Sequence, residues 1–343
     1  MPGKRYKTGM YGGSFDPMHI GHLRLILKAQ SMCDTLYIVI SASEERDRIP
    51  LNERYRWIYN SVRHLPNVKL LHLKDHEVSK EAYDNADAWE QGALEVHRMI
   101  GGPVDAVFCG SDYQGRNLWE KLYPEAEVIY EDRNEVPVSS TEIYHDPFRY
   151  WDYIPKMVRP YFVKKILFVG GESTGKSTIV TNLAEYYNTE YVEEYGRLTC
   201  DEAGGEDFVS IHDLEMNILY QKTTEWEKQR IANKLLFIDT DALTTKWFAS
   251  FLLEHDTRRQ AVEKLADAVT GIREFDLVFF MEPTVPFVQD GTRNERLLED
   301  RKMYSEQIKA EFKKAGMEMI CLDGDYNDRF RKVIDIIHER YHI

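Results

Sequence analysis

The stretch ILFVGGESTGKSTIV, residues 166–180, decides the fold of the second half of the chain. The pattern G-x-x-x-x-G-K-[ST] is satisfied by Gly170, Gly175, Lys176 and Ser177. Loops of this pattern turn backbone N–H groups toward a phosphate, between a strand and a helix. The apolar start of the stretch predicts that strand, and its end predicts that helix. Because all these parts occur together, the sequence predicts a nucleotide-binding loop rather than a structural glycine turn.

Each part of this loop has a predicted role toward ATP. Lys176 neutralises the β- and γ-phosphates, and Ser177 holds Mg²⁺. Downstream, QDGTRNERLLEDR at 289–301 offers arginines that can close over the triphosphate as a lid, although their spacing also suits an exposed helix start. The residues expected to bind ATP in this half are Gly171, Glu172, Ser173, Thr174, Gly175, Lys176, Ser177, Thr178, Arg293 and Arg296.

An acidic pair follows the next apolar strand, in KLLFIDTDAL at 234–243. Either carboxylate can hold the metal's water shell or accept a substrate proton, and an Asp at such a point also commonly caps the following helix. We assign the catalytic and metal-holding role to Asp239 and a substrate-facing role to Asp241. The N-K-x-D guanine motif is absent, since NKLL at 233–236 lacks the acid, which disfavours a GTPase.

A charged segment, YVEEYGRL at 191–198, lies between the loop and the acidic pair. Small-molecule kinases of this architecture present groups to the phosphoryl acceptor at this point. We therefore expect Glu193, Tyr195 and Arg197 at the substrate. The alternative is an ordinary solvated charge run.

Strand and helix patterns alternate along the whole chain. Apolar runs such as TLYIVIS and DAVFCGS are separated by segments of helical period, which predicts parallel sheets covered by helices on both faces. The second half repeats this alternation without repeating the sequence. We predict two α/β domains, at 1–145 and 163–343, joined by an aromatic and proline-bearing connector at 146–162.

The first domain carries a second glycine turn, GMYGGSFDPMHIGHL at 9–23. It follows a predicted strand and precedes a predicted helix, so it lies at the sheet edge where open α/β folds bind ligands. His19 and His22 are three residues apart, on one side of the first helical turn and beside backbone N–H groups that lack partners within the helix. We expect the two imidazoles to hold and polarise a phosphate, whereas a single His there is more often structural.

The stretch GGSFDPMHIGH resembles the G-x-F-D-P-x-H-x-G-H signature of the nucleotidylyltransferase superfamily, whose members transfer AMP from ATP to a phosphate and release pyrophosphate. With SSTEI, DPFRYWDYIPKMVRPYF, GGESTGKST and QDGTR, nearly the whole chain is similar to the NadR-type bifunctional enzymes. These join a Rossmann-like nicotinamide-mononucleotide adenylyltransferase domain to a P-loop ribosylnicotinamide kinase domain. The resemblance implies that the second half phosphorylates nicotinamide riboside and that the first half adenylylates the product to NAD.

The resemblance also implies site residues in the first domain. His19 and His22 are the expected catalytic pair. Asp112, in CGSDYQG, follows a strand at the ligand edge, and Trp89, in NADAWEQG, is a candidate to stack on the nicotinamide ring or to pack in the core. The residues expected to bind ATP in this domain are Gly12, Gly13, Ser14, Phe15, Ser139, Ser140 and Thr141.

One position departs from the superfamily pattern. The late motif usually reads S-[ST]-T-x-I-R, with an arginine that contacts ATP phosphates, whereas SSTEIY places Tyr144 there. Tyrosine supplies neither the charge nor the forked donors of arginine. Either Arg133, Arg149 or a lysine takes over this role, or the domain turns over weakly. The alternative function is then an active kinase with a nucleotide-sensing adenylyltransferase-like domain.

Net charge, absent motifs and cysteine spacing exclude further classes of protein. A formal net charge of −14 disfavours bulk attraction to nucleic acid or an anionic membrane. The letters HIGH also occur in class I aminoacyl-tRNA synthetases, but the K-M-S-K-S loop is absent. The four cysteines are dispersed, which indicates neither disulfides nor zinc. With no signal peptide, no room for the helix-turn-helix domain of some relatives and no membrane span, we expect a cytoplasmic protein.

The expected partners are small molecules: nicotinamide riboside, nicotinamide mononucleotide, ATP and NAD, with Mg²⁺ as the cofactor. We expect neither nucleic acid nor membrane as a partner. A homo-oligomer is compatible with the sequence. A functional link to a riboside transporter is a further expectation, because phosphorylation traps an imported nucleoside.

Overall fold

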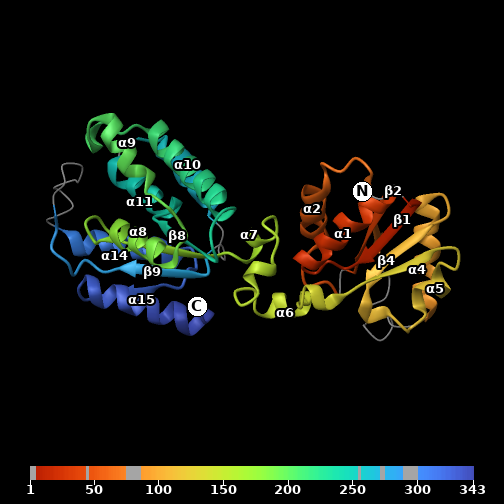
Figure 1. Cartoon of the computed structure of the whole chain (residues 1–343). Helices are drawn as coiled ribbons and strands as arrows, with labels where there is room; N and C mark the ends of the chain where they lie inside the picture. Colours follow the sequence, from red (N-terminus) through yellow and green to blue (C-terminus); the bar gives the residue numbers. More distant parts are fainter. Residues whose placement is uncertain (1–4, 44–45, 75–85, 254–255, 271–274, 289–299) are drawn as a thin grey trace. The chain divides into compact units, whose positions relative to one another are not determined.

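A computed structural model of the chain describes residues 5–43, 46–74, 86–253, 256–270, 275–288 and 300–343 (Figure 1). The side chains of residues 86 and 87 are not described. The chain divides into two compact units, Met1–Arg159 and Pro160–Ile343. Each unit contains one five-stranded sheet whose strand pairs are all parallel. The predicted fold class, two α/β domains with parallel sheets, is confirmed.

The sheet of the first unit has the strand order β3-β2-β1-β4-β5. Its strands are β1 (Tyr6–Gly13), β2 (Cys33–Ala42), β3 (Val68–Lys74), β4 (Ala106–Gly110) and β5 (Glu127–Glu131). The order reverses direction at β1, which lies between β2 and β4. Ligands bind at such a switch point, beyond the carboxyl ends of the strands, and the glycine turn at the end of β1 lies there.

Helices cover both faces of this sheet. They are α1 (Ile20–Met32), α2 (Leu51–Val62), α4 (Ala86–Ile100) and α5 (Leu118–Leu122). Figure 1 shows α1 and α2 on one face, with α4 and α5 on the other. Val96 of α4 and Trp119 of α5 pack with Met10 and Val107 in one buried cluster, so the core on this face joins the central strands to both helices.

The predicted connector is tightly packed. It follows α6 (Ser140–His145) and ends within α7 (Arg159–Phe162). Phe148, Trp151 and Phe162 are buried, and the Arg159 guanidinium lies 5.4 Å from the centre of the Trp151 ring. Buried aromatic rings of this kind add apolar packing to the segment.

The sheet of the second unit has the order β10-β9-β6-β8-β7. Its strands are β6 (Lys164–Val169), β7 (Glu190–Val192), β8 (Leu235–Asp239), β9 (Leu277–Met281) and β10 (Ile320–Leu322). The chain visits the edge strand β7 before it returns to β8 beside β6, where Phe168 pairs with Asp239. This topology brings the end of β8 next to the glycine-rich loop that follows β6.

Helices of the second unit carry the remaining site residues. They are α8 (Lys176–Tyr187), α9 (Tyr195–Ala203), α10 (Ile211–Gln229), α11 (Ala242–Leu252), α12 (Arg259–Val269), α14 (Arg301–Lys314) and α15 (Tyr326–Tyr341). The strands β6, β8 and β9 are almost completely buried. Among the described residues, no helix is both long enough and apolar enough to cross a membrane.

Candidate active sites

The glycine turn of the first unit ends in a helix capped by histidines. His19 has an extended backbone and is the N-cap of α1, and its Nδ1 accepts a hydrogen bond from the Gly21 N–H at 3.1 Å. His22 Nδ1 accepts one from the His19 N–H at 3.2 Å. The two rings stack with their centroids 3.7 Å apart. The imidazoles and the start of the helix therefore hold each other in place.

These hydrogen bonds determine the tautomer of both rings. In a neutral imidazole one nitrogen carries the proton and the other accepts. Because Nδ1 accepts in both rings, the proton lies on Nε2 in both. The expectation of free backbone donors at this helix start needs a correction, since the rings occupy the N–H groups of His19 and Gly21. Each ring therefore keeps one donor of its own, the Nε2–H group.

Both imidazoles are neutral near pH 7. Burial, with a smaller contribution from the nearby Arg133, lowers the pKa of His19 to about 4. Burial, the His19 ring and Arg133 hold the pKa of His22 well below its usual value. Gly21 is needed for this arrangement, because a Cβ atom there would lie 2.9 Å from His19 Cε1. The pair thus carries polar donors without positive charge.

A cavity of about 520 Å³ opens beside the glycine turn. Gly12, Gly13 and Ser14 line it, as do Trp89 and Trp119. The two indole rings meet edge to face with centroids 5.6 Å apart. Trp119 Nε1 is buried and has no hydrogen-bond partner among the described residues. A cavity of this size with aromatic walls and one unsatisfied donor suits the base of a nucleotide.

Asp112 and Arg133 form an ion pair on the histidine side of the turn. Asp112 lies in the short helix Ser111–Tyr113 after β4, and its Oδ1 is 3.0 Å from Arg133 Nε. Arg133 lines a smaller cavity together with the histidine pair. Arg149 instead lies over the Tyr150 ring, at 5.6 Å, and lines neither of these two cavities of the first unit.

The hydroxyl groups expected to meet ATP in α6 have partners within the chain. Ser139 is the N-cap, and its Oγ accepts a hydrogen bond from the Glu142 N–H at 3.2 Å. Ser140 Oγ donates to the Pro17 carbonyl at 2.8 Å, which ties α6 to the glycine turn. Thr141 is exposed. In this structure Ser139 and Ser140 hold the helix in position, a role that the motif alone did not indicate.

Phe15 is a core side chain rather than a surface that faces ATP. It is 1% exposed, and its ring meets the His22 ring edge to face with centroids 5.0 Å apart. It also packs edge to face on Tyr11. Its predicted place in the ATP site is therefore corrected: Phe15 supports the His22 ring from below, because the turn directs it inward.

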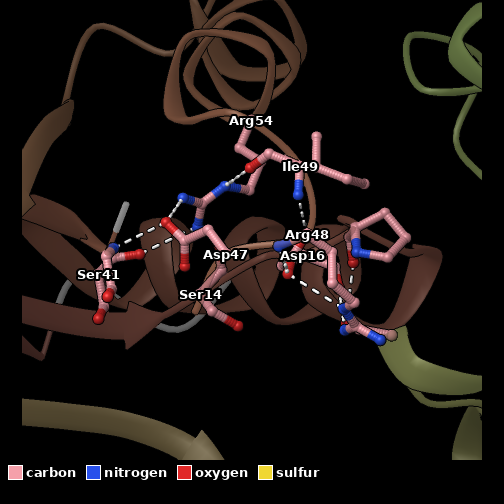
Figure 2. A network of polar contacts seen from close by, with 10 residues as sticks. Ser14, Asp16, Ser41, Asp47, Arg48, Ile49 and Arg54 are labelled. Carbon is pink, nitrogen blue, oxygen red and sulfur yellow. Dashed lines mark hydrogen bonds and ion pairs between the residues drawn. The ribbon is translucent and has the colours of Figure 1, made fainter. Parts of the chain in front are cut away.

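A buried arginine that sequence reasoning missed braces the turn from behind (Figure 2). Arg54, on α2, is completely buried and donates to the carbonyls of Ser14 at 2.6 Å, Ser41 at 3.0 Å and Ile49 at 2.9 Å. It also forms an ion pair with Asp47. Backbone carbonyls leave no trace in a sequence pattern, so this role had no signal there.

The P-loop of the second unit has the predicted strand–loop–helix form. Lys176 Nζ donates to the carbonyls of Gly170 and Gly171, both at 3.1 Å. Gly175, with φ of 88°, is the N-cap of α8. At Gly170, with φ of 146°, a Cβ atom would lie 2.7 Å from the Met281 carbonyl oxygen. Only glycine allows the loop to pass this close to β9.

The two carboxyl groups at the end of β8 lie in different surroundings, one buried outside the cavity lining and one on the cavity wall. Asp239 is 1% exposed, its Oδ2 has no hydrogen-bond partner among the described residues, and it lies outside the lining of the neighbouring cavity. Burial raises its pKa to about 6, against the lowering effect of Lys176 and Ser177. Asp241 caps α11 through the Leu243 N–H at 3.1 Å, lines the cavity, and has a pKa raised by burial to about 7.

The cavity of this unit, about 180 Å³, is strongly acidic. Its lining extends from Glu172 to Thr178 and includes Glu194, Tyr195, Arg197, Glu206 and Asp241. Burial and the neighbouring Glu206 raise the pKa of Glu172 to about 8. Lys176 and Arg197 are the cationic side chains among the described lining residues. The P-loop thus opens onto a small site with a surplus of carboxyl groups.

The structure corrects one substrate assignment. Glu193 is exposed, and its Oε1 accepts a hydrogen bond from the Tyr191 hydroxyl at 3.2 Å. The next residue, Glu194, lines the cavity instead, because β7 ends at Val192 and Glu194 is the N-cap of α9. Arg293 and Arg296 lie outside the described residues.

Two arginines hold the P-loop from behind. Arg301, the first residue of α14, donates to the Ser173 carbonyl at 2.8 Å. Arg329, on α15, is 1% exposed and donates to the Thr174 carbonyl at 2.7 Å and to the Glu282 carbonyl at 2.7 Å. Arg301, considered in the sequence as part of a lid, here braces the loop, and the role of Arg329 had no sequence signal.

Known proteins resemble each unit and the whole chain. Residues 10–159 match the cytidylyltransferase-like family, and residues 165–329 match the AAA domain family. The chain is 29% identical over 357 positions to the trifunctional NAD biosynthesis/regulator protein NadR of Escherichia coli K12, covering 98% of this chain and 84% of that protein. It is 31% identical to a phosphopantetheine adenylyltransferase of Mycoplasma mycoides, over 39% of this chain and 92% of that protein.

Two solved structures share the fold over the full length. A NadR protein in complex with NR superposes with a TM-score of 0.80 at 24% identity, covering 98% of this chain and 97% of that chain. A NadR protein in complex with NAD and AMP-PNP gives 0.78 at 24% identity, covering 99% and 98%. With both domains in the same order and matches along nearly the whole chain, this protein is similar to the NadR proteins in sequence and in fold.

Proposed function

We propose that this chain makes NAD in two steps, one in each unit. The second unit phosphorylates nicotinamide riboside with MgATP and releases ADP. The first unit then transfers AMP from a second ATP to the phosphate of the mononucleotide and releases pyrophosphate. The observation that carries this proposal is the presence of two separate phosphate turns in one NadR-type chain: the histidine-capped turn before α1 and the P-loop before α8.

For the kinase step, the contents of the second cavity support a cationic acceptor. The pyridinium ring of nicotinamide riboside carries a positive charge, and Glu172, Glu194, Glu206 and Asp241 surround the cavity. Near pH 7 Glu172, with a pKa of about 8, is mostly protonated, and Asp241, with a pKa of about 7, is about half protonated. The attraction for the ring therefore comes from the other two carboxylates and from the polar oxygen atoms of the wall. We assign Asp241 to the riboside hydroxyls, because it lines the cavity and its pKa of about 7 suits a group that accepts a proton near neutral pH.

The donor atoms behind the P-loop fit Mg²⁺. Ser177 and Asp239 offer hard oxygen atoms, and the buried Asp239 Oδ2 has no partner among the described residues. In nucleotide sites Mg²⁺ usually keeps several waters and is bound through one or two protein oxygen atoms plus the phosphates. Bound here, Mg²⁺ would neutralise phosphate charge. Lys176 would exchange its two carbonyl contacts for phosphate oxygens.

For the adenylyl step, the two Nε2–H groups support in-line transfer. A phosphate oxygen of the mononucleotide attacks the α-phosphorus of ATP, and the bond to pyrophosphate breaks. Charge accumulates on the nonbridging oxygens, and His19 and His22 donate to them from a rigid arrangement. Trp89 would stack on the nicotinamide ring in the neighbouring cavity, and Trp119 Nε1 would donate to its amide oxygen.

Product analysis tests both steps at once. Incubation of the purified chain with nicotinamide riboside and MgATP should yield ADP, nicotinamide mononucleotide, pyrophosphate and NAD. Lys176→Ala should stop mononucleotide formation but still make NAD when the mononucleotide is supplied. His22→Ala should do the reverse.

Each half of the proposal has its own failure. Absence of ADP and mononucleotide from the wild-type reaction would contradict the kinase assignment. Absence of pyrophosphate with supplied mononucleotide, while ATP still binds, would favour the alternative, a kinase that carries a nucleotide-sensing domain. Tyr144 at the motif arginine position is the observation behind that alternative.

A further inference from the structure

An arginine lies against the tyrosine that replaces the motif arginine. The Arg48 guanidinium carbon is 4.7 Å from the centroid of the Tyr144 ring. A cation over an aromatic face at this distance is attracted by the electron density of the ring. Arg48 comes from the segment between β2 and α2, and Tyr144 comes from α6, so two elements far apart in sequence place a positive charge beside this tyrosine.

Arg48 is fixed as well as charged (Figure 2). Its Nε lies 3.2 Å from Asp16 Oδ2, its Nη2 donates to the Asp16 carbonyl at 2.5 Å, and its backbone N–H donates to Asp16 Oδ2 at 3.0 Å. Asp16 also accepts the Ile49 N–H at 3.0 Å, so its carboxylate is buried and satisfied. Three contacts to one residue of the glycine turn leave the guanidinium little freedom to move with solvent.

Arg48 borders the site rather than the core. Its side chain is 29% exposed, and it lines the 520 Å³ cavity together with Gly12, Gly13 and Ser14. Arg54, six residues later, is fully buried, and its N–H groups donate to backbone carbonyls and to Asp47. The two arginines therefore have different roles: Arg54 stabilises the turn, and of the two only Arg48 is accessible to a ligand.

Arg46 and Lys74 also line this cavity, whereas Arg133 and Arg149 lie elsewhere. Arg133 lies on the opposite side, beside the histidine pair and paired with Asp112. Arg149 lies over Tyr150. Both histidines are neutral, so they cannot offset the charge of a triphosphate. Arg48 combines three features: it lies over the Tyr144 ring, it is bonded to Asp16 of the glycine turn, and it lines the cavity.

We propose that Arg48, supported by the ring of Tyr144, is the cationic side chain that binds phosphate oxygens of ATP during adenylyl transfer, in the role of the arginine that the motif lacks. Tyr144 is a positioning residue that acts through Arg48. This inference rests on the proposed adenylyltransferase function of the first unit. It predicts a turnover-competent domain despite the motif departure.

The test removes the guanidinium group at position 48 and then introduces one at position 144. Pyrophosphate release from ATP and nicotinamide mononucleotide is measured with the full chain. Arg48→Ala should lower kcat/KM for ATP about 100-fold, the size expected for losing one donor to developing charge. Arg48→Ala combined with Tyr144→Arg should recover at least tenfold of this loss. Tyr144→Phe, which keeps the ring face, should stay within about twofold of the wild type.

Two controls separate this role from general damage. Riboside phosphorylation by the second unit should be unchanged in every variant. Arg230→Ala removes another arginine that lies 4.7 Å from an aromatic ring, that of Trp226, and should leave both reactions intact. Wild-type turnover with an equally active Arg48→Ala variant would overturn the inference alone, whereas an inactive wild type would overturn the adenylyltransferase function itself. A loss that accompanies a fall in Tm and is not rescued by Tyr144→Arg would make Arg48 a structural brace and also overturn the inference.

Discussion

The two phosphate turns of this chain use opposite electrostatics. The first presents two neutral imidazoles, with pKa values lowered by burial, and the Arg48 guanidinium at its cavity is paired with Asp16. The second presents the permanent charge of Lys176 within a cavity lined by four carboxyl groups. The difference shows that a glycine turn after a central strand fixes where a phosphate binds, while the side chains around it decide how its charge is stabilised.

The two turns also share one device. A buried arginine from another element binds the backbone carbonyls of each turn: Arg54 in the first unit and Arg329 in the second. Arg54 has a carboxylate partner in Asp47, whereas Arg329 binds carbonyls and the Thr284 hydroxyl. Turns rich in glycine have few side chains of their own to pack, so distant guanidinium groups supply the rigidity.

Removal of these braces should give the largest effects. Arg54→Leu leaves the carbonyls of Ser14, Ser41 and Ile49 without this donor and removes the ion-pair partner of Asp47. It should lower the free energy of unfolding of the first unit by about 3–5 kcal/mol. Arg329→Leu should cost less, about 1–3 kcal/mol, because it strands carbonyls rather than a charge. Chemical denaturation followed by both activity assays would measure this.

Arg56→Leu is the matched control for Arg54, since Arg56 lies on the same helix but pairs with Glu53 at the surface. It should change the unfolding free energy by less than about 1 kcal/mol. Equal costs for Arg54→Leu and Arg56→Leu would show that the brace contributes nothing.

Distortion of the histidine cap should have the next largest effect. Gly21→Ala places a Cβ atom 2.9 Å from His19 Cε1, so the ring must shift and Nε2 moves from its place. We expect adenylyl transfer to fall about 100-fold, as for the loss of a donor to the transition state, while riboside phosphorylation is unchanged. Gly102→Ala, where a Cβ atom meets open space, is the control. Similar rates for the two alanine variants would contradict the role of the cap.

The pH dependence of the two reactions should differ. Asp239 and Asp241 have pKa values raised to about 6 and about 7, so they take up protons as the pH falls. The phosphorylation rate should drop about tenfold between pH 7.5 and pH 5.5. The His19 pKa of about 4 keeps the histidine side of the other reaction constant over this range. Parallel pH profiles from one preparation would contradict this assignment.

The smallest effect should come from the acidic wall of the second cavity. Glu206→Gln removes one carboxylate from the wall, but it also lowers the pKa of Glu172, which burial first and Glu206 second raise. Glu172 then ionises more and offsets part of the loss, so the attraction for the pyridinium ring should weaken only modestly. We expect KM for nicotinamide riboside to rise about three- to fivefold with kcat little changed, a loss of about 1 kcal/mol. Glu202→Gln, on the exposed side of α9, should leave KM unchanged. A lower KM for Glu206→Gln would indicate that this wall does not attract the substrate.

Much of the fold followed from the sequence because both glycine turns carry local signals. Each has an apolar strand before it and a helical period after it, and the strand predicted from the apolar start of the stretch at 166–180 is observed as Lys164–Val169. The parallel sheets follow from the alternation of strands and helices. Family resemblance supplied the function, which spacing alone could not, because a P-loop does not identify the phosphoryl acceptor.

The missed residues share a physical reason. Arg54 and Arg329 bind backbone carbonyls of distant segments, and a pattern of side chains does not record such acceptors. Glu193 was assigned in place of Glu194 because the short strand β7 ends at Val192. Beyond the strand end, the alternation of side chains between the two faces no longer predicts which side chain faces the cavity. Arg48 was not considered, because in the sequence Tyr144 indicated only that the motif arginine is absent, and nothing there placed an arginine beside it.

The histidine cap has a consequence for local unfolding. Since Nδ1 of each ring accepts a main-chain N–H of the first turn of α1, fraying of that turn would also release the imidazoles from their stacked arrangement. Opening of a helix end takes far less free energy than global unfolding. The exchange of the amide hydrogens of His19 and Gly21 with solvent would therefore report, residue by residue, the fraction of time for which this site is assembled.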